Sequence, residues 1–185
     1  MEIKIKSKLI FKVLQVLSWV IFTALCIEAG RMLLNTVITL CIHAHGVRNF
    51  WDGADYLARV YKFDQGCFLV ISTVIIIVAV LKAIIFYLII KVFTEKKISI
   101  AQPFSIELKH FISKQAFLAL GIGLFTYSGN KYIIWLAAHG MATPNLQSLN
   151  LGGADVWFFM SIILFVIVQL VNSGIEIQAE NDLTI

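Results

Sequence analysis

The stretch "CFLVISTVIIIVAVLKAIIFYLIIKVF", residues 67–93, decides the class of this fold. Its only charged residues are Lys82 and Lys91. A helix rises about 1.5 Å per residue, so a run of this length exceeds the roughly 30 Å hydrocarbon core of a bilayer. Lipid offers no hydrogen bonds to the backbone, which favours a helix over a strand. The stretch therefore predicts a membrane-spanning helix.

Composition extends this prediction to the whole chain. Of the 185 residues, 59% are hydrophobic and 14% are charged, whereas soluble domains are about 45–50% apolar and about 25% charged. Three further apolar blocks predict spans at about 9–34, 114–138 and 156–175, of which the block at 114–138 is the weakest because it contains "TYSGNKY". We therefore expect an all-α integral membrane protein with one domain over residues 1–185, folded as a four-helix transmembrane bundle.

The distribution of basic residues predicts the orientation of this bundle. Lysines crowd the N-terminus and the loop 94–113, whereas the loop 139–155 contains neither Lys nor Arg. Because basic residues remain on the cytoplasmic side, both termini, the loop 94–113 and the tail 176–185 are expected in the cytoplasm. The basic groups flank apolar spans and do not form one face, so we expect the bilayer, and not nucleic acid, as the direct partner.

The first extracytoplasmic loop contains a predicted amphipathic helix at about 47–62. Its apolar positions recur at helical spacing, namely Val47, Phe50, Ala54, Leu57 and Tyr61. The aromatic residues of this segment suit a membrane–water boundary. We expect an interfacial helix that lies on the outer leaflet; the alternative is a lid over a cavity between the spans.

Ionisable residues inside predicted spans are costly in lipid and are candidates for function. Glu28 and Arg31 share one face of the first helix, and Asn130 with Lys131 reaches a similar height in the third. They predict a polar cluster that caps the bundle from outside; the alternative is that these side chains snorkel to the interface. The pattern leaves open whether the first helix ends near Arg31 or continues to Cys41.

Lys82 lies about eleven residues before Phe93, near the middle of the membrane, where snorkelling is least effective. Gln169 in the last span is expected at a related depth. Lys82 therefore either faces a polar interior with Gln169 or Tyr127, or reaches down toward the cytoplasmic lipid headgroups. The sequence favours neither.

Enzyme and metal chemistry have no matching motif. The histidines and carboxylates lack the spacing of a metal site, so we expect no catalytic activity, no metal and no cofactor. The three cysteines form no CxxC pair. Cys41 and Cys67 are both expected near the outer surface, where they either form a disulfide or remain free thiols.

The chain closes on "GIEIQAENDLTI", residues 174–185. This ending resembles the C-terminal signature of the YoaS-like bacterial proteins, the domain of unknown function 2975 family. The matching residues are Gly174, Glu176, Glu180, Asn181, Asp182, Leu183 and Thr184. Two further stretches agree with this family, "LKAIIFYLIIKVF" at 81–93 and "PFSIELKHFISKQA" at 103–116. The resemblance implies a small four-span protein of the bacterial inner membrane.

Members of that family have no established activity and are commonly found beside a small helix-turn-helix regulator. The resemblance thus implies a regulatory or sensing membrane partner of such a regulator, docked at the cytoplasmic face. The candidate docking residues are Lys96, Lys97, Glu176, Glu180, Asn181, Asp182, Leu183, Thr184 and Ile185. The tail could instead be a structural cap on the loop 94–113. Alternative functions are an accessory subunit of a larger membrane complex, or a small oligomeric transporter or lipid-binding protein.

Overall fold

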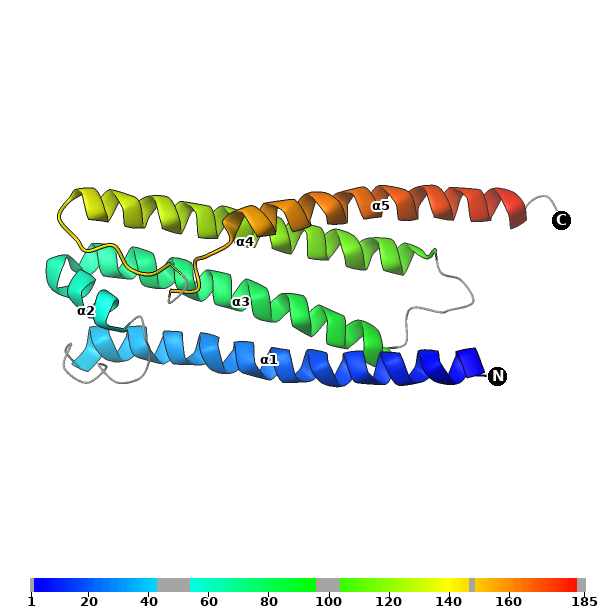
Figure 1. Cartoon of the computed structure of the whole chain (residues 1–185), viewed down its shortest axis with the longest axis horizontal. Coiled ribbons are helices and arrows are strands. Elements are labelled where there is room, and N and C mark those ends of the chain that lie inside the picture. The colour runs from blue at the N-terminus through cyan, green and yellow to red at the C-terminus, as the bar shows by residue number, and fades with distance from the viewer. Residues whose placement is uncertain (1, 43–53, 96–103, 147–148, 183–185) are drawn as a thin grey trace.

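The computed structural model describes residues 2–42, 54–95, 104–146 and 149–182, and these residues form helices and no strand. The helices, in chain order, are α1 (Glu2–Ile42), α2 (Ala54–Phe63), α3 (Gln65–Glu95), α4 (Ile106–Ala138) and α5 (Ala154–Asp182). The four long helices run lengthwise in alternating directions, so that the start of α1 and the end of α5 lie at the same end of the molecule (Figure 1). The prediction of an all-helical chain is confirmed for the described residues.

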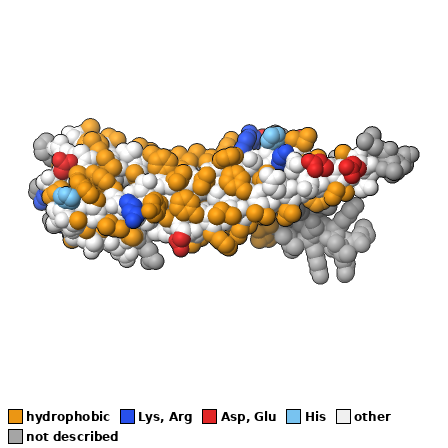
Figure 2. Space-filling model, turned by 90° about the horizontal axis from the view of Figure 1, so that it is seen from above, with side chains coloured by type: hydrophobic (Ala, Val, Ile, Leu, Met, Phe, Trp, Pro, Cys, Tyr) orange, Lys and Arg blue, Asp and Glu red, His pale blue; other side chains and the backbone are white. Residues whose placement is uncertain are grey.

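Three of these helices are long and apolar enough to cross a membrane. The qualifying segments are Lys12–Cys41 of α1, Gln65–Glu95 of α3 and Ala154–Asn181 of α5. Hydrophobic side chains cover much of the surface seen in Figure 2, with few charged side chains among them in its middle. An apolar exterior of this kind indicates a membrane protein. α4 is equally long, with 33 residues, but polar side chains interrupt its apolar run.

The long helices pack in a row. Backbone contacts join α1 to α3, α3 to α4, and α4 to α5, and α2 packs on α3 (Figure 1). Within the described residues α1 makes no close backbone contact with α4 or α5. The long helices therefore form a row within the described residues, and the four-helix transmembrane bundle stays a prediction.

The first helix runs without interruption past Arg31 to Ile42, so it is longer than the predicted span at 9–34. At the other end of the chain, α5 continues to Asp182, beyond the predicted limit at 175. α5 begins level with the middle of α3 (Figure 1). The stretch between α4 and α5, residues 139–153, fills the place that an earlier start of α5 would occupy; we call it the α4–α5 connection.

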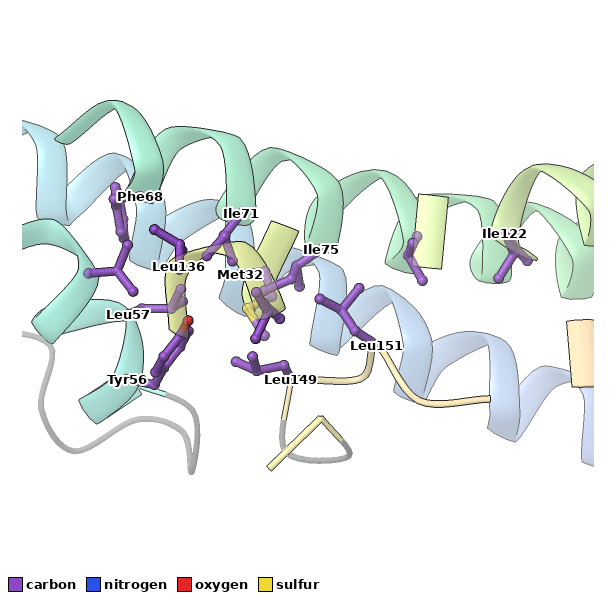
Figure 3. Close-up of a cluster of buried hydrophobic side chains, with 13 residues drawn as sticks. Met32, Tyr56, Leu57, Phe68, Ile71, Ile75, Ile122, Leu136, Leu149 and Leu151 are labelled. Carbon is purple, nitrogen blue, oxygen red and sulfur yellow. The ribbon is translucent and has the colours of Figure 1, made fainter. Parts of the chain in front are cut away.

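The apolar core lies at the end of the molecule that contains α2. Leu149 and Leu151 of the α4–α5 connection are fully buried there with Met32 of α1 and Ile75 of α3 (Figure 3). Gly129 of α4 makes room for this packing: a Cβ at that position would lie 3.0 Å from Val74 and 3.3 Å from Leu151. The glycine therefore allows α3, α4 and the connection to approach closely.

The helix expected at 47–62 is present from Ala54 onward as α2, and residues 47–53 lie outside the described part of the chain. Its buried face consists of Tyr56, Leu57 and Val60, which pack into the core. This face is therefore covered by protein, and the position of the helix on the outer leaflet stays a prediction. The face is covered because the joint is short: only Asp64 separates α2 from α3, so α2 folds back onto Phe68 and its neighbours.

Asp64 also caps the start of α3. Its Oδ1 accepts a hydrogen bond from the backbone N–H of Cys67 at 2.7 Å. Hydrogen bonds from backbone N–H groups stabilise the charged carboxylate and hold the pKa of Asp64 below its ordinary value. The joint between α2 and α3 is thus fixed by both apolar packing and a helix cap.

Replacing Leu149 with Ala tests whether the α4–α5 connection is part of the core. The side chain is 0% exposed, so its loss should leave a cavity and destabilise the protein by about 2–5 kcal/mol. Ile134→Ala is the matched control, since Ile134 of α4 is 60% exposed. Unfolding in detergent should show a clear loss for Leu149→Ala only; equal stability of the two variants would contradict the packing.

Candidate functional site

The central feature of the candidate site is Lys82, a cation in the middle of an apolar helix. It lies about 26 Å from the start of α3 and about 20 Å from its end, as judged from the helix rise. Its Nζ donates a hydrogen bond to the backbone oxygen of Asn150 at 3.3 Å. The same atom lies 6.0 Å from the centre of the Trp157 ring, at the start of α5. Lys82 therefore joins α3 to the α4–α5 connection and borders α5.

Asn150 links this cation to a carboxylate on a third element. Its side-chain Nδ2 donates a hydrogen bond to Oε1 of Glu28 in α1, while its carbonyl accepts from Lys82. The backbone of Asn150 has a φ of 54°, a left-handed conformation that asparagine tolerates better than most residues. The buried side chains of Leu149 and Leu151 hold it on both sides. The result is a polar bridge from α1 to α3 through the α4–α5 connection.

A hollow lies beside this bridge. Its volume is about 250 Å³, and it is lined by Lys82, Asn150, Gly152 and Gly153. The two glycines leave backbone uncovered by side chains, and the ammonium of Lys82 is the charged group in the lining. Such a lining offers hydrogen-bond donors and positive charge, so it suits an anionic group.

The predicted cluster of Glu28, Arg31, Asn130 and Lys131 does not form. Arg31 and Lys131 are exposed, and Lys131 Nζ lies 5.5 Å from the ring centre of Tyr127 on its own helix. Oδ1 of Asn130 is buried and has no hydrogen-bond partner among the described residues. The cluster does not form because α3 lies between α1 and α4 in the row and keeps their side chains apart.

The predicted partners of Lys82 are also wrong. Gln169 and Tyr127 both have exposed side chains, and Asn150 takes their place. The depth estimate assumed that α5 begins at the same membrane boundary as the other spans. Since α5 starts near Lys82, Gln169 lies 15 residues further on, about 22 Å along the helix.

Sequence reasoning missed Asn150 because it falls in a loop without charges. A signal is nevertheless present in "LNLGG", residues 149–153. Two leucines flank the asparagine and two glycines follow it, which is typical of a short segment anchored by apolar side chains around a polar one. That pattern would have marked the segment as buried.

The candidate docking residues divide into two groups. Glu176, Glu180, Asn181 and Asp182 belong to the last turns of α5, whereas the others lie outside the described residues. The undescribed candidates are Lys96, Lys97, Leu183, Thr184 and Ile185. The acidic part of the predicted tail is therefore helical and continuous with the last apolar helix.

A second polar cluster connects the start of α4 to the end of α5. Lys109 Nζ donates to Oδ1 of Asn172 at 2.5 Å, and Nδ2 of Asn172 donates to Oε1 of Glu176 at 2.7 Å. The ring of Phe104 lies against Gly174, where an added Cβ would come within 2.6 Å of it. We call these five residues the α4–α5 clasp. It brings together two of the stretches on which the family resemblance rests.

All three cysteines are free thiols. Of the two possibilities for Cys41 and Cys67, the structure therefore has the free thiols and not the disulfide. Within the described ranges no three His, Cys, Asp or Glu side chains group in a way that could hold a metal ion.

Comparison of the chain with models of known protein families, with curated proteins and with solved structures finds no match. What the protein does has therefore to be argued from the polar bridge at Lys82 and from the clasp.

Replacing Glu28 with Ala tests the polar bridge. The substitution leaves Nδ2 of Asn150 without its acceptor, which should lower the free energy of unfolding by about 1–3 kcal/mol. Glu28→Gln keeps an acceptor oxygen and should retain much of the stability. Arg31→Ala, three residues along the same helix and exposed, is the control. Thermal unfolding in detergent measures all three; a loss for Arg31→Ala as large as for Glu28→Ala would refute the bridge.

Proposed function

We propose that this chain is a four-span protein of the bacterial inner membrane that holds a basic, DNA-binding regulator at its cytoplasmic face. The fourth span of this proposal is α4. It lies between α3 and α5 in the row, so a membrane that α3 and α5 cross also surrounds α4. Its polar side chain Gln115 is buried and donates to the Ile85 oxygen at 3.1 Å. Polar groups satisfied inside the protein are compatible with a span.

The proposed orientation follows from the basic residues near each end of the row. Lys91, Lys109 and Lys114 lie toward the end that contains both the start of α1 and the end of α5. The α4–α5 connection lies toward the opposite end and has no Lys or Arg. Because basic flanks stay in the cytoplasm, the end with both termini is proposed as cytoplasmic.

Fusions to alkaline phosphatase, which is active only outside the cytoplasm, test this orientation. A fusion after Thr143 in the α4–α5 connection should be active, and one after Ile185 should be inactive. Green fluorescent protein at the same two positions is the matched control and should give the reverse pattern. Activity of the C-terminal fusion would refute the proposed orientation, because it would place the end of α5 outside the cytoplasm.

The observation that supports docking is the clasp with the helical end that it fixes. Hydrogen bonds from Lys109 through Asn172 to Glu176 hold the last turns of α5 against the start of α4. Beyond the clasp, the side chains of Ile177 and Glu180 are exposed. Acidic side chains gather toward this end of the surface in Figure 2. The protein thus presents a fixed, acidic helix end.

The charge of this helix end indicates the kind of partner. The last turn of α5 contains no basic residue, and the sequence places Asp182 at its end. Negative side chains at a helix C-terminus are unfavourable, because the helix dipole is negative at that end. A cationic partner would relieve this repulsion. DNA-binding proteins present basic faces of this kind, so binding here would compete with binding to DNA.

This competition is the regulatory mechanism that we propose. A regulator held at α5 cannot use the same basic face for DNA, and its release restores DNA binding. The proposal agrees with the membership in the YoaS-like family that the tail suggests, and with the helix-turn-helix neighbour that the family implies. Both the membership and the partner are part of the proposal.

Affinity purification in mild detergent tests the docking proposal. A chain that ends at Glu180 should insert normally but lose a small basic protein that co-purifies with the full chain. Capture by the full chain should also weaken as salt is raised, because the contact is electrostatic. Asp155→Asn, an acidic residue in the first turn of α5, is the control and should keep the partner. Equal recovery of the partner from the truncated and full chains would overturn the proposal.

A further inference from the structure

We infer that the hollow beside Lys82 binds the anionic headgroup of an amphiphile, a phosphate or carboxylate group attached to an acyl chain. This inference does not depend on the cytoplasmic partner proposed above. It rests on three properties of the hollow, namely the charge of its lining, its size and the surface next to it.

The charge of the lining favours an anion. Lys82 has three N–H groups, of which one donates to the carbonyl of Asn150. Glu28, the nearby carboxylate, accepts from the side chain of Asn150 and is not part of the lining. A molecule bound in the hollow would therefore contact the ammonium group of Lys82 and the backbone of the two glycines. Attraction between opposite charges strengthens as surrounding water is reduced, and Lys82 is partly buried here, so an anion would gain more than beside a fully exposed lysine.

The size of the hollow limits what it can hold. Its volume of about 250 Å³ is below the roughly 300–1,000 Å³ of pockets that enclose a drug-sized molecule. A phosphate or carboxylate group with a few neighbouring atoms fits, and a complete lipid does not. The remainder of a larger ligand must therefore lie outside the hollow.

The surface beside the hollow suits an acyl chain. Val156 lies next to Gly153, with its side chain 3.9 Å from where a Cβ of that glycine would be. Val156 is 60% exposed, and Phe159 and Met160 continue the exposed apolar surface along α5. A polar hollow that adjoins an exposed apolar helix face matches a molecule with an anionic head and an apolar tail. A free inorganic anion would use only the first of these features.

Lipid binding to the purified full-length protein tests the inference. We would titrate phosphatidylglycerol or palmitate into the protein in phosphatidylcholine nanodiscs and count retained molecules by native mass spectrometry. Lys82→Met should weaken binding of the anionic amphiphile by about tenfold or more, since it removes a charge-assisted hydrogen bond. Lys82→Arg should keep most of the affinity. The stronger of the two ligands identifies the headgroup, and binding of either at Lys82 supports the inference.

Lys131→Met is the matched control. Lys131 also lies near an aromatic ring, 5.5 Å from that of Tyr127, but it is exposed and does not line the hollow beside Lys82. It should bind the amphiphile as the wild type does. If Lys82→Met and Lys131→Met retain the wild-type affinity, or lose it equally, the inference is wrong. Inorganic phosphate that competes as strongly as phosphatidylglycerol would also overturn it, because the site would then take a free anion.

A second variant keeps the test decisive if Lys82→Met does not fold. Val156→Asn changes an exposed side chain next to the hollow and leaves Lys82 in place. It should reduce the preference for palmitate over a short-chain carboxylate such as butyrate, with little effect on butyrate itself. An unchanged dependence on chain length would show that the apolar face of α5 takes no part and would refute binding of an amphiphile.

Discussion

The ammonium group of Lys82 is the constraint on which the arrangement of the helices depends. A charge in the middle of an apolar helix needs a hydrogen-bond partner from outside that helix, because the helix uses its own carbonyl groups. The α4–α5 connection supplies the partner through Asn150. Irregular backbone at this depth is tolerated only where protein covers it, and Leu149 and Leu151 provide that cover. The connection thus occupies the first part of the path of α5, which begins late and extends beyond the other helices at the opposite end.

The order of the helices in the row agrees with the hydrogen bonds that their buried polar side chains make. Gln115 of α4 donates to the Ile85 oxygen of α3, and Ser161 of α5 donates to the Ala116 oxygen of α4, each at 3.1 Å. These bonds join the three helices pairwise, where lipid offers little apolar driving force for association. No such side-chain bond to another long helix is found in the described part of α1, whose polar link is Glu28 to Asn150. α1 therefore forms one edge of the layer: it packs on α3, and its polar link runs through the α4–α5 connection.

Local patterns were sufficient to predict the helices but not the contacts between them. The apolar run at 67–93 predicts α3 because length and composition are properties of a single segment. The predicted cluster of Glu28 with Lys131 does not form, because similar height along two helices does not make them neighbours and α3 lies between α1 and α4. The partner of Lys82 was wrong because depth was counted from a common boundary, whereas α5 starts beside Lys82 itself. The sequence marked Lys82 and Glu28 as candidates but missed Asn150, because its signal "LNLGG" lay outside the predicted spans.

The two proposals meet in α5, which lies beside Lys82 at Trp157 and enters the clasp at Glu176. The helix connects these points over about 28 Å. A shift of one end along the helix axis would therefore move the other end as well. Two contacts between an aromatic ring and a glycine limit such a shift. Phe158 lies against Gly123, where an added Cβ would be 3.0 Å from the ring, and Phe104 lies against Gly174. α5 cannot slide gradually past α4 at these contacts, because a ring that moves off its glycine would collide with the side chain of a neighbouring residue. An anionic amphiphile at Lys82 would therefore influence a cytoplasmic partner only by moving α5 from one such register to another, and coupling between the ends would require both glycine contacts to change together.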